Sequence, residues 1–398
     1  MIESQNGFLS ILASFTLFIQ VACADNPRAT SEHSQSPTPE THSTDEANAC
    51  IGGDVPVGPH LEAPPADCPS TLSEAAREIQ AGFIGDASQQ VVMQSELLDP
   101  NVINVVLCGT GTPVPSPRTQ SCTAVFVGGK FFLFDAGDGA SRSIEALNLP
   151  LTRLEALFLT HFHSDHIAGV GEVISRSWIL GRTTPVSIYG GALVERIVDG
   201  FNLVYGVDDA YRVAHHGAEF FPIDVARAQA QHIQPPGIHG QTVYEEHGIK
   251  ITAFEVDHSP VVPALGYRIE YRDTVVAISG DTSASEGLTN LAANADILVS
   301  DVMNKGFIED TECALAALPP ATRGTAIFRD IRTYHIDVAE LGDMAEQANV
   351  ATLALTHLVP TPADEDQVQN LFRSPIAERF SGALIVGEDG TRITRALE

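Results

Sequence analysis

The stretch Thr160–Gly169, "THFHSDHIAG", places three histidines and an aspartate within six residues, between an apolar run and a glycine. His161 and His163 are two residues apart, so their side chains point the same way from an extended segment. Asp165 and His166 then begin a helix, where Asp165 would also suit the N-terminus in a purely structural role. Imidazole and carboxylate groups are suitable zinc ligands, and the lack of sulfur ligands leaves room for a reactive water. The stretch therefore predicts a metal site.

Other histidines and aspartates follow apolar runs, at the points where strands are expected to end. They are Asp257 and His258 after "ITAFEV", Asp281 after "TVVAISG", Asp301 after "DILVS", and His357 after "TLALT". Taken singly, each histidine would be a buried core residue and each aspartate a turn cap. Taken together with the first stretch, they predict a site built on rigid supports. Two groups of ligands imply two metals, and Asp281 is the candidate bridge between them.

The pattern along the chain predicts a mixed α/β fold. Short runs rich in β-branched and aromatic residues are separated by glycine and proline, at 102–107, 123–127, 130–134 and 154–160 and again after residue 185. Helical patterns fall between them at 167–180, 338–348 and 364–372. We expect one folded domain over 101–398, preceded by a helical N-terminal extension over 70–100.

The N-terminus has the composition of an export signal. Phe8–Ala22 is apolar and uncharged, so residues 1–24 are expected to be a signal peptide, or a lipoprotein signal with a lipid anchor on Cys23. Residues 25–69 are rich in Ser, Thr and Pro and predict a disordered linker. These features place the protein in the periplasm, on the outer cell surface or in the medium.

Cysteine usage fits an exported chain. Cys50 and Cys68 could close a loop, and Cys108 and Cys122 could pair between neighbouring strands. The alternative is that Cys108, Cys122 and Cys313 are buried free thiols.

The motifs "HFHSDH", "DHSPVVPALGYRIEY", "SGDTS" and "LTHLVP" resemble those of the metallo-β-lactamase superfamily, in its branch of ribonuclease Z and bacterial arylsulfatases. The resemblance covers about 101–398 and implies a four-layer αβ/βα sandwich with two zinc ions at one edge, manganese or iron(II) being alternatives. By motif, the first ion would be held by His161, His163 and His258. The second would be held by Asp165, His166 and His357, with Asp281 bridging the two.

The resemblance also implies the catalytic groups. Asp165 would orient the attacking hydroxide as general base. His335, in "RTYHIDVAELG", resembles the family's His-Ser-Thr element and would be the general acid. Asp301, in "SDVM", stands where ribonuclease Z has a glutamate and would orient His335. Its structural alternative is an N-cap or a loop ion pair. Asp135, in "LFDAGDG", would support the metal loop.

Three observations lead us to expect that nucleic acid is not the substrate. The formal net charge is −29, with no cluster of Lys or Arg. Twenty-two residues separate His258 from Asp281, where ribonuclease Z inserts its tRNA-gripping arm. The chain is also expected to be exported. The substrate would then be a small-molecule or extracellular ester, either a sulfate ester or a phosphodiester. Residues 189–247 are expected to form loops over the metals. Arg212 and His216 in this segment, and Arg118 outside it, are candidates to line the pocket, or else ordinary surface residues.

Two other functions remain open at this stage. One is a lactonase or β-lactamase-type hydrolase, for which opening of a cyclic ester or lactam would be the sign. The other is a non-catalytic, metal-bearing domain that binds at the cell surface. A homodimer is a further expectation, taken from family members alone.

Overall fold

The computed structural model describes residues 73–316 and 323–397. The expected signal segment and linker, together with Cys23, Cys50 and Cys68, lie outside the described residues. Within them, no helix has the length and apolar character needed to cross a membrane.

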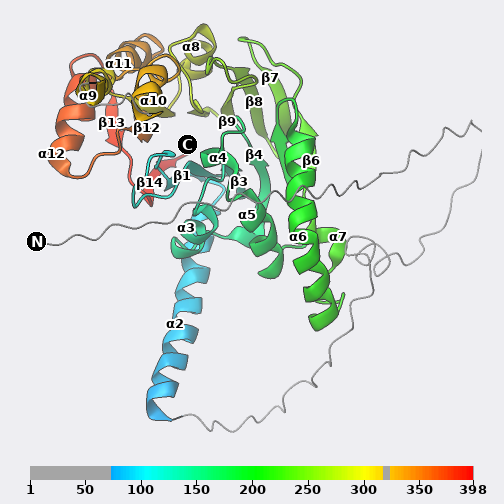
Figure 1. Ribbon diagram of the computed structural model, residues 1–398. Helices are drawn as coiled ribbons and strands as arrows, with labels where there is room; N and C mark the ends of the chain where they lie inside the picture. Colours follow the sequence, from blue (N-terminus) through cyan, green and yellow to red (C-terminus); the bar gives the residue numbers. More distant parts are fainter. Residues whose placement is uncertain (1–72, 317–322, 398) are drawn as a thin grey trace, which may run out of the picture. The chain divides into compact units, whose positions relative to one another are not determined.

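Two seven-stranded sheets face each other (Figure 1). In spatial order the first sheet contains β14 (Thr391–Ala396), β1 (Val102–Gly109), β2 (Cys122–Val127), β3 (Lys130–Phe134), β4 (Leu154–Phe158), β5 (Ser187–Gly190) and β6 (Gln229–His232). The second contains β13 (Ala383–Val386), β12 (Thr352–Val359), β11 (Ile297–Met303), β10 (Thr274–Ile278), β9 (Leu265–Tyr271), β8 (Ile249–Glu255) and β7 (Gln241–Glu246).

Helices connect and cover these strands. They are α2 (Glu74–Leu97), α3 (Ala140–Ala146), α4 (Ser164–Ile167), α5 (Val170–Ile179), α6 (Val194–His216), α7 (Ile223–Ala226), α8 (Glu286–Ala292), α9 (Lys305–Ala316), α10 (Arg323–Ile331), α11 (Val338–Gln347), α12 (Glu365–Gln367) and α13 (Ser374–Ala377). A 3-10 turn spans Leu151–Arg153, and a π-helical segment spans Val368–Arg373.

Side-chain alternation along the strands explains why four layers form. Along β1, Val105 and Leu107 point into the core between the sheets, whereas Val106 and Cys108 point to the core beneath α3 and α5. Because successive residues of a strand face opposite sides, a strand that is apolar throughout requires cover on both faces. The second sheet is covered in the same way by α8 and α11. The predicted αβ/βα sandwich is confirmed.

Both sheets combine an antiparallel part with a parallel part, and this arrangement positions the site. β3 and β4 run parallel in the first sheet, as do β10, β11 and β12 in the second. Carboxyl ends of parallel strands meet at one edge, which is where ligands bind in open α/β sheets. The metal-competent residues therefore come from the same edge of both sheets.

Contacts between the sheets hold that edge together. The Tyr267 hydroxyl, on β9, donates to the carbonyl of Leu159 at 2.6 Å, and the amide of Leu265 donates to the carbonyl of Thr160 at 2.9 Å. Tyr267 also packs edge-on against Phe158, with ring centroids 5.3 Å apart. The segment that precedes His161 is thus fixed from the opposite sheet.

The cysteines resolve one of the open alternatives. Cys108 on β1 and Cys122 on β2 form a disulfide, so the pairing hypothesis holds for them and the free-thiol alternative is wrong. Cys313, on α9, is free but exposed rather than buried.

Candidate metal centre

The first group of ligands consists of three converging histidines. His161 Nε2 lies 3.0 Å from His163 Nδ1, and His258 Nε2 lies 3.4 Å from the same atom. Tetrahedral zinc with Zn–N bonds of about 2.0–2.1 Å places its nitrogen ligands about 3.4 Å apart. The spacing and the donor set therefore fit one zinc ion.

The second group contains Asp165, His166 and His357. His357 Nε2 lies 3.1 Å from Asp165 Oδ2, and His166 Nε2 lies 3.7 Å from the same oxygen. Within the described chain, the buried Nε2 of His166 makes no hydrogen bond. A buried nitrogen without a partner is costly, and a metal ion would satisfy it.

Asp281 lies between the two groups. Its Oδ2 is 3.9 Å from His161 Nε2 and from His258 Nε2, and 3.3 Å and 3.5 Å from the Nε2 atoms of His166 and His357. One buried oxygen thus reaches both groups, as a bridging ligand must. The predicted metal-site residues are all brought together, and their ligand atoms fall into clusters no wider than 4.8 Å.

The pKa values differ between the two groups of histidines. Burial acts to lower the pKa of His166, but Asp281 and Asp135 raise it well above the usual range. Burial acts to raise the pKa of Asp281, but His357 and His166 hold it well below the usual range. Burial lowers the pKa of His258 to about 4, which keeps this ring neutral as a metal ligand requires. Metal binding at His166 would therefore replace a proton.

Contacts behind the ligands fix their orientation. Asp135 accepts hydrogen bonds of 2.8 Å from His166 Nδ1, from the Thr160 amide and from the Thr160 hydroxyl. His258 Nδ1 lies 2.8 Å from the carbonyl oxygen of Tyr334, so its Nε2 faces the centre. Asp135 and His357 both adopt left-handed backbone conformations, with φ of 56° and 45°. Such backbone strain is concentrated at functional sites.

Replacing Asp135 by asparagine tests this supporting role. The amide cannot accept three hydrogen bonds with the strength of a carboxylate, and His166 loses a counter-charge. We expect zinc affinity to fall by about 10- to 100-fold, the usual effect of removing such a support. Competition titration against a chromophoric chelator measures it. Asp343→Asn, which alters only an exposed ion pair with Arg379, is the matched control. Unchanged affinity in Asp135→Asn would contradict the role.

His335 and Asp301 form a pair beside the metal ligands. His335 Nδ1 lies 2.9 Å from Asp301 Oδ2, and both side chains are buried. Asp301 lies inside β11, where the ladder to β12 is irregular, and is neither a helix cap nor part of a loop. Burial raises the pKa of Asp301 despite the opposing effect of His335. The ring of His335 lies 5.3 Å from those of His258 and His357, so it faces the metal centre.

The secondary candidates from the sequence lie elsewhere. Arg118 donates to the Thr110 hydroxyl and to the carbonyl of Gly387, which is a structural role. Arg212 pairs with Asp208 within α6, and His216 stacks on Phe221. Residues 194–216, expected as loops over the metals, instead form one long helix, α6.

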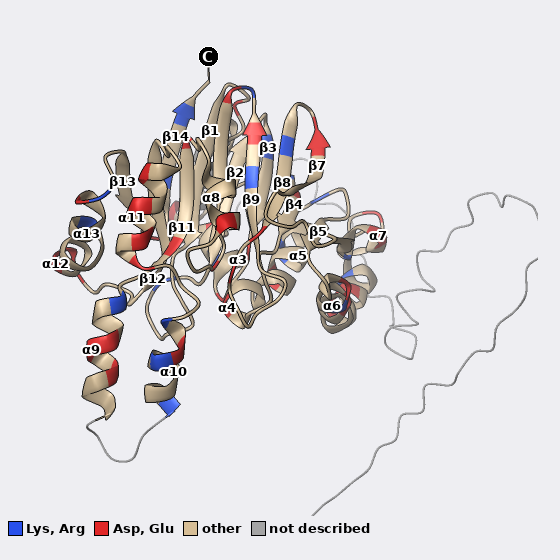
Figure 2. Ribbon diagram, turned by 90° about the horizontal axis from the view of Figure 1, so that it is seen from above, with Lys and Arg blue, Asp and Glu red and all other residues tan. Residues whose placement is uncertain are grey.

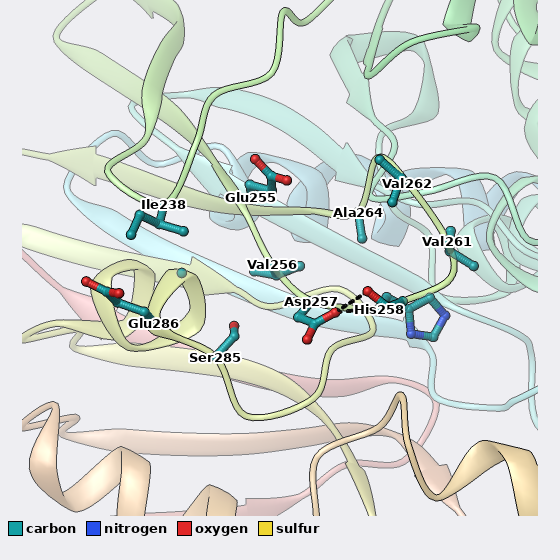
Figure 3. Close-up of a pocket in the computed structure, with 12 residues that line it drawn as sticks. Ile238, Glu255, Val256, Asp257, His258, Val261, Val262, Ala264, Ser285 and Glu286 are labelled. Atoms are coloured by element: carbon teal, nitrogen blue, oxygen red, sulfur yellow. Dashed lines mark hydrogen bonds between the residues drawn. The ribbon is translucent and has the colours of Figure 1, made fainter.

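Two cavities of similar size adjoin the centre, and their walls differ. The first, of about 320 Å³, is lined by His163, Asp165, Asp281, His335 and His357, and beyond them by apolar residues of α9 and α10. The second, of about 340 Å³, lies behind His258 and is lined by Glu255, Asp257 and Glu286 (Figure 3). Asp257 is turned to its own loop, accepting a 2.7 Å hydrogen bond from the Ser259 hydroxyl. An anionic substrate is repelled by the second cavity, so it is expected to enter through the first.

The α9–α10 wall is the functional element that sequence reasoning missed. Its apolar members are Phe307, Ile308, Ile327, Phe328 and Ile331. The signal for it was the long stretch between Asp301 and His335, which contains two helical patterns.

The profile of the metallo-beta-lactamase superfamily matches residues 115–357, which include every residue of the two ligand groups and Asp281. The chain belongs to the metallo-beta-lactamase superfamily. A Mycobacterium bovis BCG protein named Ribonuclease Z is 34% identical over 301 residues, covering 73% of this chain and 98% of that protein. A protein of the same name from Mycobacterium marinum is 34% identical over 298 residues, with the same coverage of both chains.

Solved structures of the superfamily share the fold. The metallo-beta-lactamase fold protein YhfI from Bacillus subtilis has a TM-score of 0.53 at 21% identity, covering 74% of this chain and all of that one. The short form of human tRNase Z has a TM-score of 0.50 at 18% identity, covering 73% of this chain and 98% of that one. Metal-dependent hydrolysis is the chemistry that the superfamily match and these relatives support.

The relatives overturn two expectations from the sequence. We expected an exported enzyme acting on a sulfate ester or other extracellular ester, and we expected nucleic acid not to be a partner. Relatives named for ribonuclease activity, at 34% identity along nearly their whole length, contradict the expected choice of a sulfate ester or extracellular phosphodiester and the exclusion of nucleic acid, whereas they do not test export. The error lay in reading the net charge of the whole chain as a property of the site. Net charge describes the average field around a protein and not the local charge of one site.

Proposed function

We propose that this chain is a dinuclear zinc hydrolase that cleaves phosphodiester bonds of RNA, with tRNA as the first substrate to test. The observation that carries the proposal is the 34% identity to Ribonuclease Z over 98% of that protein, combined with a cluster that can hold two metals beside a His–Asp pair. Zinc is preferred because the ligands are nitrogen and oxygen donors at tetrahedral spacing.

The residues would divide the work as follows. Seven side chains would hold the ions: His161, His163, Asp165, His166, His258, Asp281 and His357. Two zinc ions, when bound, supply a water of lowered pKa and neutralise charge on the phosphate. Asp165, whose side chain lines the same cavity, would orient that water as general base. His335 would donate its Nε2 proton to the leaving oxygen, and Asp301 would hold the ring of His335 in place through Nδ1.

RNA binding by this chain would depend on the metals more than on basic side chains. Lys and Arg residues are scattered among acidic ones over the described surface (Figure 2). Few counterions are then released when RNA binds, so the KM for RNA should change little with salt. This is the opposite of the behaviour of a protein that grips RNA with a basic patch.

The test uses the full chain loaded with zinc. A tRNA with a 3′ extension, the same tRNA without the extension, and bis(4-nitrophenyl) phosphate are assayed side by side, with and without chelator. We expect chelator-sensitive cleavage of the extended tRNA at its 3′ side. Hydrolysis of the small diester with no cleavage of either RNA would overturn the RNA substrate while leaving the diesterase chemistry in place.

The compartment of the protein stays a prediction. The expected signal lies outside the described residues. Cys108 and Cys122 form a disulfide, and disulfides persist mainly in oxidising compartments. Cell fractionation with an antibody to the chain decides between export and retention.

A further inference from the structure

The hairpin of α9 and α10 presents large apolar side chains to the cavity beside the metal centre. Figure 2 shows the two helices side by side, with their axes directed away from the sheets. Ile308 is completely buried against Met303 and Val359, which anchors the hairpin to the ends of β11 and β12. Phe328 and Ile331 pack against the same small core.

Two apolar residues of the hairpin remain partly exposed. Phe307 is 40% exposed and Ile327 is 50% exposed, yet both line the cavity at the metal centre. With Phe328 and with Val114 from the opposite side, they form an apolar chamber. Large apolar side chains gathered around a concave site usually mark a binding surface.

The chemistry of the chamber restricts its occupant. Apart from the metal-binding Asp165 and Asp281, its lining contains no Asp, Glu, Lys or Arg among the described residues. The whole cavity, including its edge at the metal centre, has a volume of about 320 Å³, so the apolar part has room for one ring system rather than for a long chain. Phenylalanine side chains bind planar rings well, because any aromatic or nucleobase face can stack on them.

The position of His335 indicates on which side of the scissile bond the chamber lies. Ile331 ends α10, and His335 follows four residues later in the same cavity lining. In an in-line displacement, the oxygen that leaves departs on the side opposite the attacking water. The group that protonates it must therefore lie next to the leaving group.

We propose that the chamber formed by Phe307, Ile327, Phe328 and Val114 binds the nucleobase of the leaving nucleoside. This inference rests on the proposed RNA function. It adds that the enzyme recognises the base on the leaving side of the scissile bond. In the reaction, water gives a proton to Asp165 and its oxygen bonds to phosphorus. The bond from phosphorus to the leaving oxygen breaks, and His335 supplies a proton to that oxygen. The base remains in the chamber until the product dissociates.

The first test compares two dinucleotides that differ only on the leaving side, one with adenine and one with an abasic ribose. Stacking of one base on an aromatic side chain corresponds to about 5- to 150-fold in kcat/KM. We expect the wild type to prefer the adenine substrate by a factor in this range, and Phe307→Ala to bring the ratio close to one. Phe220→Ala, a 74% exposed phenylalanine outside the cavity, is the control and should keep the preference. An unchanged preference in Phe307→Ala would overturn the proposal.

A second measurement separates failure of the chamber from failure of the RNA function. Phenyl phosphate and methyl phosphate are compared as inhibitors of bis(4-nitrophenyl) phosphate hydrolysis. Tighter inhibition by the phenyl compound, lost in Phe307→Ala, supports the chamber even if no RNA is cleaved. Equal inhibition by both compounds in the wild type would overturn the chamber whether or not RNA is cleaved. Should Phe307→Ala fail to fold, Ile327→Ala is tested in the same way, because Ile327 is half exposed.

Discussion

Replacing Asp281 by alanine should abolish hydrolysis and prevent the chain from retaining two metal ions. One oxygen of this carboxylate approaches four histidine nitrogens at 3.3–3.9 Å, so both halves of the centre lose a ligand at once. Residues that merely support a ligand change metal affinity by about 10- to 100-fold, and a shared ligand should exceed that range. We therefore expect kcat/KM to fall by more than about 100-fold, measured with bis(4-nitrophenyl) phosphate at saturating zinc.

Metal content separates this loss from general damage. Elemental analysis of the purified variant should find fewer zinc ions per chain than in the wild type. Asp343→Asn, on the surface of α11, should keep both activity and metal. A variant with full metal content and full activity would show that Asp281 does not bridge, and the two-metal assignment would have to be withdrawn.

The fold could be predicted because its information is local. Strands such as β1 are apolar on both faces, and this alone requires helices on both sides of the sheets. The candidate metal ligands were equally accessible, because His161, His258, Asp281 and His357 follow or end apolar strand patterns and the others lie in the compact motif "HFHSDH". The positions of His357 and Asp301 differ slightly from the prediction. Both residues lie within irregular parts of their strands, whereas we expected them directly after the strands.

Features that depend on distant packing could not be predicted. Helix α6 exposes three large apolar residues and contains two glycines: Leu203, Val204 and Tyr211, with Gly200 and Gly206. Its sequence therefore lacks a regular amphipathic pattern, and we expected loops there. The resemblance predicted that Asp301 orients His335, which lies 34 positions along the chain, but it did not predict the distance between them. An aspartate is one methylene shorter than the glutamate of ribonuclease Z. The motif therefore did not predict that His335 Nδ1 and Asp301 Oδ2 lie 2.9 Å apart.

Replacing His335 by alanine should affect substrates according to their leaving groups. A ribose hydroxyl is a poor leaving group and requires a proton, whereas 4-nitrophenolate departs without one. General acid catalysis contributes about 10²- to 10⁴-fold, so RNA cleavage should fall by a factor in that range and diester hydrolysis far less. Asp301→Asn should show the same pattern more weakly, because the ring of His335 keeps its place but loses its charged partner.

Metal analysis of the His335 variant decides between two roles that the geometry allows. His335 also lies close enough to His258 and Asp281 to act as a ligand itself. If it is the general acid, His335→Ala should keep the zinc content of the wild type while losing activity selectively on RNA. His247→Ala, an exposed histidine on the surface, serves as control. Equal losses on both substrates with less bound zinc would make His335 a ligand. The leaving-group side of the reaction would then lack a proton donor, and the assignment of the neighbouring apolar chamber to the leaving nucleoside would lose its main geometric support.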